Sequence, residues 1–370
     1  MIARARLRRN PPSRARWHRS VIAFALGAGL SALSAAQSPP ASEPFTGGGS
    51  ETAASRSRIA LVLPLESDTY AQAAEAVKAG FLAAAATAQA KPLIIGHGDG
   101  DVMRAFAKAS ESGARVIVGP LVRDDLKTLT EAKAELPPTL ALNQLDDGTP
   151  LPAHMYTLAL TVEGDARQLA RRMRSDGAQT VAVIASDSPL QMRFASAFGA
   201  EWILAGGDAP SLIRFGRATE ALAVLKRGLA RTPPNAVLLA LDSADAALVK
   251  PYLGTIATYA GSQVNDRQPR EVRRDLDDVF FVDIPWLADP EAAAFANYAR
   301  PKMPNPTLER LYALGIDAFR VAQSFEDGPV ARLEFDGATG HLSLDASRQF
   351  VREGRLLQFR AGEIASVDGR

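Results

Sequence analysis

The hydrophobic positions of the chain fall into short apolar runs that are separated by longer segments of helical composition. The first run, Arg58–Leu65, leads into the Ala-rich segment Tyr70–Gln89, and similar runs follow at Pro92–Ile95, Arg115–Val118 and Thr139–Leu142. Unbroken apolar runs between helices are typical of parallel strands that are buried on both faces. The pattern therefore predicts a series of βαβ units.

Three helices are expected around these strands, at Tyr70–Gln89, Asp101–Ser112 and Arg123–Leu136. The third is expected to end at Pro137 and Pro138, because proline lacks a backbone donor and its ring clashes with the preceding helical turn. Together these elements predict a first lobe over about residues 58–160.

A second round of the same pattern follows. Its expected helices are Val162–Ser175, Pro189–Leu204, Ala218–Arg231 and Ser243–Tyr252, and its expected strands are Thr180–Ala185, Ser211–Phe215, Ala236–Leu241, Thr255–Ala260 and Val279–Ile284. Leu222, Leu225 and Leu229 form one apolar stripe, as expected for a helix that packs on a sheet. We predict a second lobe over about residues 161–285.

The C-terminal part changes character. A helix is expected at Leu308–Phe325, followed by short antiparallel strands at Leu333–Phe335, His341–Leu344 and Leu356–Arg360 with glycine-containing turns between them. This order predicts that C-terminal segments return to the first lobe. The predicted fold class is therefore α/β, with two lobes that each contain a mostly parallel sheet flanked by helices.

The N-terminal residues have the pattern of an export signal. Residues 1–20 contain seven arginines and no acidic residue, Val21–Ala35 is apolar but too short to span a bilayer, and small residues precede Gln37. We expect residues 1–36 to be a signal peptide cleaved after Ala36. The alternatives are an uncleaved anchor or a start codon assigned too far upstream of Val21. Residues 37–57 are rich in proline, glycine and serine and are expected to be a flexible linker before a domain at 58–370.

Charge and cysteine content exclude several classes of function. Loss of the seven signal arginines lowers the formal net charge from +1 to −6, so a nucleic-acid partner is not expected. The sequence contains no cysteine, which excludes disulfides, thiolate metal sites and a lipidated cysteine within it. We predict a periplasmic protein with no transmembrane segment after signal cleavage, which would associate with the outer membrane through its partners.

The polar residues show no pattern of a catalytic centre. His97, His154 and His341 lie in separate predicted loops or strand ends, without a second histidine or a carboxylate at metal-ligand spacing. The segment Gly96–Asp101 lacks the pattern of a phosphate-binding loop, and neither Gly-x-Ser-x-Gly nor Ser-x-x-Lys occurs. We therefore predict no catalytic residue, no metal and no cofactor, and a protein that is not an enzyme.

Two α/β lobes that face each other usually form a ligand cleft at the carboxyl ends of their strands. On this basis the candidate cleft residues are Ser67, Tyr70, Gly119, Asn143, Gln144 and Ser186. The loops also have a structural interpretation, because Gly119-Pro120 is typical of a turn and Ser188-Pro189 of a helix start.

The segment Gln263–Asp278 is the largest charged feature and carries four arginines among acidic residues. Arg270, Arg273 and Arg274 are the candidate partner-binding surface. The alternative is a solvated loop whose charges screen one another, since surface ion pairs usually contribute little.

Several of these segments resemble known proteins. Ile59–Leu65, Val116–Leu121 and Thr139–Asn143 look like the type I periplasmic-binding-protein fold, which branched-chain amino-acid receptors share. Further segments are similar to the C-terminal domain of the LppC/LpoA family of penicillin-binding protein activators, namely Thr258–Gln263, Asp275–Asp278, Asp283–Trp286, Ala313–Phe319 and Asp336–Ser343. The similarity extends from about Arg58 to Val367.

The resemblance implies regulation. Family members bind a bifunctional class A penicillin-binding protein, a peptidoglycan synthase, and stimulate cell-wall synthesis. Longer members also carry a helical-repeat domain and a lipid anchor, where this sequence has only the linker Gln37–Ser57 and no cysteine. The expected function is that of a non-enzymatic periplasmic regulator of such a synthase. The alternative is a solute-binding receptor for an amino acid or a similar small molecule.

Overall fold

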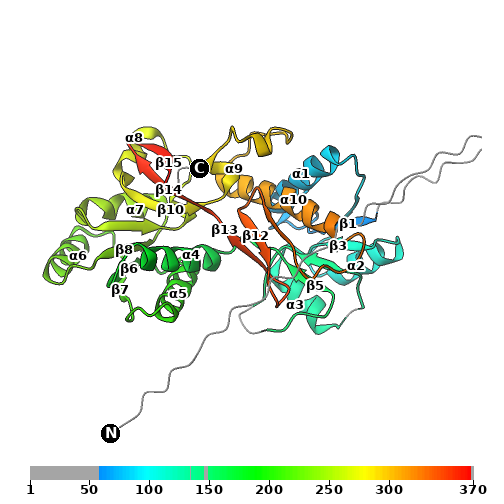
Figure 1. The fold of residues 1–370 in the computed structure, drawn as a ribbon, viewed down its shortest axis with the longest axis horizontal. Helices are drawn as coiled ribbons and strands as arrows, with labels where there is room; N and C mark the ends of the chain where they lie inside the picture. The colour runs from blue at the N-terminus through cyan, green and yellow to red at the C-terminus, as the bar shows by residue number, and fades with distance from the viewer. Residues whose placement is uncertain (1–57, 134, 146–148, 368–370) are drawn as a thin grey trace, which may run out of the picture. The chain divides into compact units, whose positions relative to one another are not determined.

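Two β-sheets, each with helices on both faces, organise the part of the chain that the computed structural model describes, residues 58–133, 135–145 and 149–367 (Figure 1). The expected signal peptide and linker, residues 1–57, lie outside the described residues. The described residues contain the elements of both predicted lobes.

The first sheet is parallel throughout and has the strand order β2-β1-β3-β4-β5. Its strands are β1 Ile59–Leu63, β2 Leu93–Gly96, β3 Val116–Val118, β4 Thr139–Ala141 and β5 Met155–Thr157. The helices that follow its strands are α1 Ala71–Thr87, α2 Val102–Glu111 and α3 Arg123–Glu131. All five residues of β1 are buried, because separate apolar clusters cover the two faces of the sheet.

The end of α3 differs from the prediction. The helix ends at Glu131, well before the two prolines that were expected to stop it. The chain leaves the helix earlier because Lys133 adopts a left-handed backbone conformation, with φ of 48°. Pro137 and Pro138 lie beyond the helix, directly before β4.

The second sheet has the strand order β15-β14-β10-β9-β8-β6-β7. Its parallel strands are β6 Val181–Ala185, β7 Ser211–Arg214, β8 Ala236–Ala240, β9 Ala257–Ala260 and β10 Val279–Asp283, and its antiparallel strands are β14 Arg355–Arg360 and β15 Glu363–Ser366. The helices are α4 Val162–Ser175, α5 Pro189–Leu204, α6 Thr219–Arg231, α7 Ser243–Val249 and α8 Arg270–Arg273. α4 and α5 cover one face of the sheet, and α6 and α7 cover the other.

The C-terminal elements divide between the two lobes. The elements that lie with the first lobe are α9 Pro285–Ala288, α10 Pro306–Ser324 and the antiparallel strands β11 Glu334–Asp336, β12 His341–Leu344 and β13 Phe350–Glu353. In contrast, β14 pairs with β10 of the second sheet, and β15 pairs with β14. The last of the three expected C-terminal strands is therefore antiparallel as predicted, but it joins a different sheet from the other two.

α1 and α10 lie side by side and meet at their backbones (Figure 1). A Cβ atom on Gly80 would lie 1.8 Å from the carbonyl oxygen of Tyr312, and one on Gly315 would lie 2.1 Å from that of Val77. Only glycine permits this approach, since it has no Cβ atom. In the described part of the chain, neither these helices nor any other combine the length and apolar composition needed to cross a membrane.

Candidate functional site

The chain passes between the two lobes three times. It crosses at residues 158–161 between β5 and α4, at Ile284 between β10 and α9, and at Gly354 between β13 and β14. Two adjoining cavities lie beside these crossovers and are lined by residues of both lobes. This region is the candidate functional site.

The larger cavity has a volume of about 410 Å³. The polar residues in its wall include Tyr70, Arg123, Asn143, Thr161, Glu163 and Arg193. Arg193 Nε lies 3.2 Å from Glu163 Oε1, and Thr161 Oγ1 accepts a hydrogen bond from the N–H of Gly164 at 3.2 Å, which caps α4. Because its wall carries both charge signs, this cavity suits a small polar or zwitterionic molecule.

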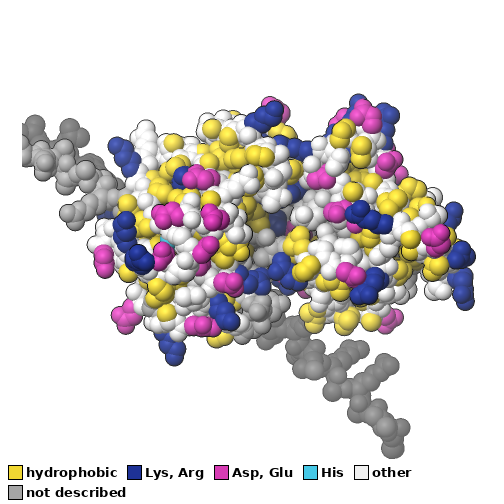
Figure 2. Space-filling view, turned by 180° about the vertical axis from the view of Figure 1, so that it is seen from behind, with side chains coloured by type: hydrophobic (Ala, Val, Ile, Leu, Met, Phe, Trp, Pro, Cys, Tyr) yellow, Lys and Arg dark blue, Asp and Glu magenta, His cyan; other side chains and the backbone are white. Residues whose placement is uncertain are grey.

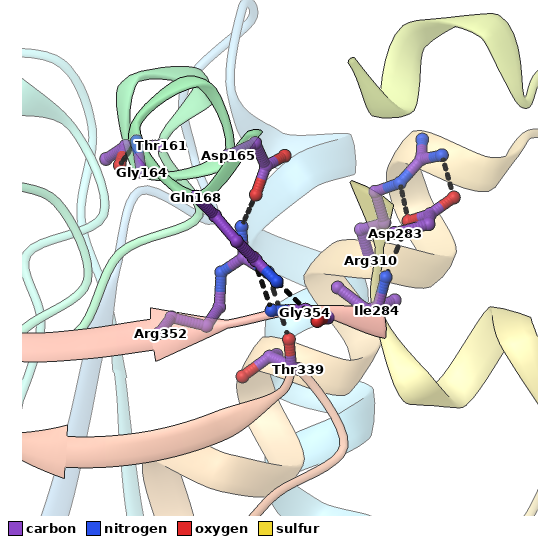
Figure 3. A network of polar contacts seen from close by, with 10 residues as sticks. All are labelled: Thr161, Gly164, Asp165, Gln168, Asp283, Ile284, Arg310, Thr339, Arg352 and Gly354. Carbon is purple, nitrogen blue, oxygen red and sulfur yellow. Dashed lines mark hydrogen bonds and ion pairs between the residues drawn. The ribbon is translucent and has the colours of Figure 1, made fainter. Parts of the chain in front are cut away.

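The smaller cavity has a volume of about 140 Å³ and shares part of its wall with the larger one. Its wall contains the carboxylates of Asp165 and Asp283 and the guanidinium groups of Arg310 and Arg352. Buried charges are costly unless they are paired and hydrogen-bonded. The structure pairs all four of these charges (Figure 3).

Arg310 of α10 binds Asp283 at the end of β10. Its Nε donates to Asp283 Oδ1 at 2.8 Å and its Nη2 to Oδ2 at 2.6 Å, a bidentate arrangement. Nη2 also donates to the carbonyl oxygens of Ser262 and Asn265, at 2.9 and 3.1 Å. Burial disfavours the charge of Arg310, but attraction to Asp283 outweighs it and keeps the pKa of Arg310 above its usual value. The pair joins α10 of the first lobe to the crossover at Ile284.

Arg352 of β13 makes a second contact between the lobes. It forms a buried ion pair with Asp165 of α4, and its Nη1 donates to the carbonyl oxygen of Thr339 at 3.1 Å. Nearby, Gln168 of α4 donates to the carbonyl oxygen of Gly354 at 2.8 Å and accepts from its N–H at 2.9 Å (Figure 3). Burial raises the pKa of Asp165, although Arg352 opposes this effect. These contacts hold the crossover at Gly354 against α4.

Asp317 holds the turn between β11 and β12 against α10. Its Oδ1 accepts the N–H of Ala338 at 2.8 Å, and its Oδ2 accepts both the N–H and the hydroxyl of Thr339 at 2.7 Å. Burial raises the pKa of Asp317 in spite of these hydrogen bonds. Because Thr339 also accepts from Arg352, the polar contacts run without interruption from α10 to α4.

Segments that carry the family resemblance converge on this network. Ser262, Asp283, Asp317 and Thr339 each come from a different one of those segments. Arg310 joins the first two of them, and Asp317 binds Thr339 directly. The shared role of these residues in the structure is to hold the crossovers in place.

Two of the six predicted cleft residues, Tyr70 and Asn143, line the larger cavity. The amide of Asn143 is already engaged, because its Nδ2 donates to the carbonyl oxygen of Leu121 and its Oδ1 accepts the N–H of Gln144, both at 2.9 Å. Gln144 is therefore next to the cavity wall but is not part of it. The structure brings these three residues together, and their role in binding stays a prediction.

The other three predicted cleft residues lie away from that wall. Ser67 is buried, and its Oγ accepts two backbone N–H groups at 3.3 and 3.2 Å before α1 begins. Gly119 has φ of 124°, and a Cβ atom there would lie 2.2 Å from the carbonyl oxygen of Val62. The N–H of Ser186 donates to the carbonyl oxygen of Ala240 at 3.2 Å. The contacts of all three maintain local structure.

The predicted partner surface is more ordered than the loop that was expected. Arg270 and Arg273 belong to α8 and pair with Glu363 of β15, at 3.1 and 3.5 Å. Arg274 begins the next helical turn and is exposed. A Cβ atom on Gly362 would lie 2.4 Å from the carbonyl oxygen of Arg270, so α8 packs tightly on the turn between β14 and β15. The segment is thus a short helix that packs on the turn between β14 and β15 at the surface of the second lobe.

His341 has two carboxylate neighbours that the sequence did not predict. Pairing of β11 with β12 brings Asp336 Oδ1 to 2.9 Å from its Nδ1 and Glu334 Oε1 to 3.0 Å from its Nε2, although the sequence spacing suggested no carboxylate partner. The hydrogen bond to Asp336 raises the pKa of His341. Among the described residues, no group of three or more histidine, aspartate or glutamate side chains is placed to hold a metal ion.

Sequence reasoning missed the central charges of the network, which are Asp165, Asp283, Arg310 and Arg352. One signal for them exists, because Arg310 and Asp317 are seven residues apart and so lie on one face of α10, beside its apolar stripe. A charged residue that is buried at such a position requires a partner, but the pattern does not identify that partner. Asp165 and Arg352 have no such local signal, since 187 positions separate them in the sequence.

Comparison with known sequences identifies relatives of the chain. The model of the family described as "LppC putative lipoprotein" matches residues 52–362. Penicillin-binding protein activator LpoA of Edwardsiella piscicida is 28% identical over 306 residues, which cover 71% of this chain and 44% of that protein. The chain spans about half the length of the curated relatives that it matches.

Two solved structures share the fold. A Chromobacterium violaceum protein described as "a putative branched-chain amino acid ABC transporter" is 35% identical with a TM-score of 0.73, over 82% of this chain and 99% of that one. The C-domain of LpoA from Haemophilus influenzae, described as a regulator of PBP1A, has a TM-score of 0.73 at 24% identity, over 84% of this chain and 99% of that one. The predicted two-lobed α/β fold is confirmed.

Proposed function

The chain belongs to the LppC family, and from this premise we propose that it binds a class A penicillin-binding protein and stimulates peptidoglycan synthesis. The match to the family model over residues 52–362 carries the proposal, because it includes both cavities and the whole crossover network. Relatives named as activators, such as LpoA of Edwardsiella piscicida, indicate a regulator rather than an enzyme. We extend this to a protein that performs no catalysis itself.

The site of action would be the periplasm. We propose that residues 1–36 direct export, that residues 37–57 form a linker, and that the domain from residue 58 makes the contact with the synthase. The C-domain of LpoA from Haemophilus influenzae, described as a regulator of PBP1A, has the same fold as this domain and supports the proposal that the domain contacts the synthase. This chain spans about half the length of these relatives. That it shares the activity of the whole relatives is therefore part of the proposal.

The crossover network supports a regulator whose two lobes keep one arrangement. Arg310 with Asp283 and Arg352 with Asp165 are buried ion pairs that join elements of different lobes. A movement of the lobes that separated either pair would leave charges buried without a partner, which costs several kcal/mol. A protein surface built on both lobes would therefore present a constant shape to the synthase.

We expect the Arg274→Glu variant to bind a purified class A synthase about fivefold or more weakly than the unchanged protein, because a charge is reversed on the proposed contact surface. Its melting temperature should be nearly unchanged, since Arg274 is exposed. Biolayer interferometry would measure the binding, and glycan polymerisation from lipid II would measure stimulation of the synthase. Arg270 and Arg273 are unsuitable for this test, because their reversal would also place acidic groups against Glu363.

Arg115→Glu is the matched control, because this arginine is exposed and directly precedes β3 in the first lobe, whereas α8 belongs to the second. It should bind and stimulate the synthase like the unchanged protein. If both variants bound the synthase equally weakly, or if Arg274→Glu bound it like the unchanged protein, Arg274 would not belong to the contact surface. Failure of the unchanged protein to bind or stimulate any class A synthase of its host would overturn the proposed function itself.

A second candidate function is binding of a small solute, and the cavity of about 410 Å³ with its Arg193–Glu163 pair favours it. The Chromobacterium violaceum protein described as an amino acid transporter has the same fold. A ligand at a hundredfold excess over its Kd would stabilise the protein by about 2.7 kcal/mol. Under the regulator proposal, thermal-shift measurements with the common amino acids should show no such stabilisation. A clear shift with one amino acid would favour the receptor function.

A further inference from the structure

β7 forms one edge of the second sheet. It pairs with β6 through Ser211–Arg214, and among the described residues no strand lies on its other side. The N–H of Phe215 donates to the carbonyl oxygen of Ala185 at 2.8 Å, toward β6. Because backbone groups alternate in direction along a strand, those of Leu212 and Arg214 point to the open edge. The edge is therefore able to pair with a further strand.

Both faces of the sheet carry apolar surface at this edge. Leu212 pairs in register with Val183, whose side chain lies on the α5 face, and Leu212 is 60% exposed there. The helix that precedes β7 in the sequence, α5, ends with the exposed residues Ile203 and Leu204. Exposed apolar residues on a sheet edge mark a surface for strand pairing.

The opposite face contains a groove of about 500 Å³ between β7 and α6. Ile213 and Phe215 of the strand segment and Leu225 of the helix contribute to its wall, together with Val224, which is 59% exposed. An added strand alternates its side chains between the two faces. Apolar side chains on such a strand would therefore enter the groove on one face and cover Leu212 on the other.

Most of the charged residues around the groove are basic, although the acidic residue Glu220 also lies in its wall. Arg227 and Arg231 are exposed and lie on the same face of α6 as Val224, and Lys226 is exposed beside them. Arg214 at the end of β7 is 80% exposed at its side chain and pairs with the exposed Asp187 at 2.8 Å. In Figure 2, basic side chains gather at the end of the molecule where α6 lies. A second copy of this chain would bring like charges together here, whereas acidic residues would be attracted.

We propose that the β7 edge binds an extended segment of a partner protein that has apolar residues flanked by acidic ones, and that this segment pairs with β7 as an additional strand. Main-chain hydrogen bonds to Leu212 and Arg214 would hold the segment, and its side chains would select it. The surface is separate from Arg274 and from the crossover cavities, so the proposal does not depend on synthase binding.

The test uses a labelled peptide, Glu-Glu-Val-Leu-Val-Val-Glu-Glu, and its counterpart with lysine in place of glutamate. Fluorescence anisotropy should show saturable binding of the acidic peptide and much weaker binding of the basic one. Arg227→Glu combined with Arg231→Glu should weaken binding of the acidic peptide about fivefold or more. Arg104→Glu is the control, because this arginine is 82% exposed on α2 of the other lobe, and it should leave binding unchanged.

Two further measurements distinguish strand addition from other binding. Leu212→Pro removes an outward N–H without removing a hydrogen bond to β6, so it should abolish peptide binding while circular dichroism stays unchanged. Bound peptide should also slow hydrogen exchange at the amides of Leu212 and Arg214 in the unchanged protein. Absence of acidic-peptide binding, equal binding by the Arg227→Glu/Arg231→Glu variant, or no exchange protection at β7 would overturn the proposal. A concentration-dependent dimer that Leu212→Pro abolishes would instead assign the edge to a second copy.

Discussion

Replacing Arg310 with methionine is expected to lower the free energy of unfolding by about 3–5 kcal/mol, the cost of breaking a buried ion pair at one partner. Methionine retains the aliphatic part of the side chain, so the loss arises from the charge. The carboxylate of Asp283 would stay buried with only Asn265 Nδ2 and the N–H of Ile284 as donors. The carbonyl oxygens of Ser262 and Asn265 would also lose the guanidinium group.

Urea unfolding at neutral pH measures this effect. The double variant Arg310→Met/Asp283→Asn should lose less stability than Arg310→Met alone, because no buried charge then lacks its partner. Arg332→Met is the matched control at an exposed position and should change stability by less than about 0.5 kcal/mol. A loss below about 1 kcal/mol for Arg310→Met, or a larger loss in the double variant, would contradict the role given to this pair.

Gly315→Ala is expected to destabilise the protein by about 3 kcal/mol or more, at the upper end of overpacking effects. This result runs against helix propensity, because alanine favours a helix more than glycine does. The added Cβ atom would lie 2.1 Å from the carbonyl oxygen of Val77 and 2.7 Å from the backbone nitrogen of Phe81. Both are backbone atoms of α1, so the clash is relieved only if α1 and α10 move apart.

The same substitution elsewhere provides the control. Gly199 lies within α5, and a Cβ atom there meets no atom within 4 Å, so Gly199→Ala should stabilise the protein by about 0.5–1 kcal/mol. Gly80→Ala should be destabilising like Gly315→Ala, since its Cβ atom would lie 1.8 Å from the carbonyl oxygen of Tyr312. Thermal melting of the three variants compares them directly. Similar melting temperatures for Gly315→Ala and Gly199→Ala would show that the helices do not depend on this contact.

Most of the helices and strands could be predicted from the sequence, because hydrophobic periodicity and helix-breaking residues are local properties. The strands β13 and β15 and the short helices α8 and α9 were not expected. The predicted bounds of α4 and α5, Val162–Ser175 and Pro189–Leu204, coincide with those observed. Alternation of strands with helices then leads to parallel sheets covered on both faces, and so to the fold class. The sequence did not show which sheet the segment 356–360 joins, because strand pairing is not a local property. The structure shows that this segment pairs with β10.

The candidate site was accessible to sequence reasoning only in part. Tyr70 and Asn143 line the larger cavity because loops after parallel strands meet at one edge of a sheet. Gly119 follows a strand in the same way, but its contacts maintain the backbone beside Val62. Position along a strand predicts which edge a residue reaches. It does not predict whether the side chain faces the cavity.

The sequence by itself determined most of the elements of this protein, its fold class and its family resemblance, since these depend on patterns of residues that are near one another in the chain. Only the tertiary structure decided how distant positions meet. The pairing of Asp165 with Arg352, the pairing of Asp283 with Arg310 and the contact of Gly80 with α10 join different elements, and no local pattern specifies them. These contacts arise because folding removes water from surfaces that face each other. Charges buried there require partners of opposite charge, and backbones in close contact require glycine.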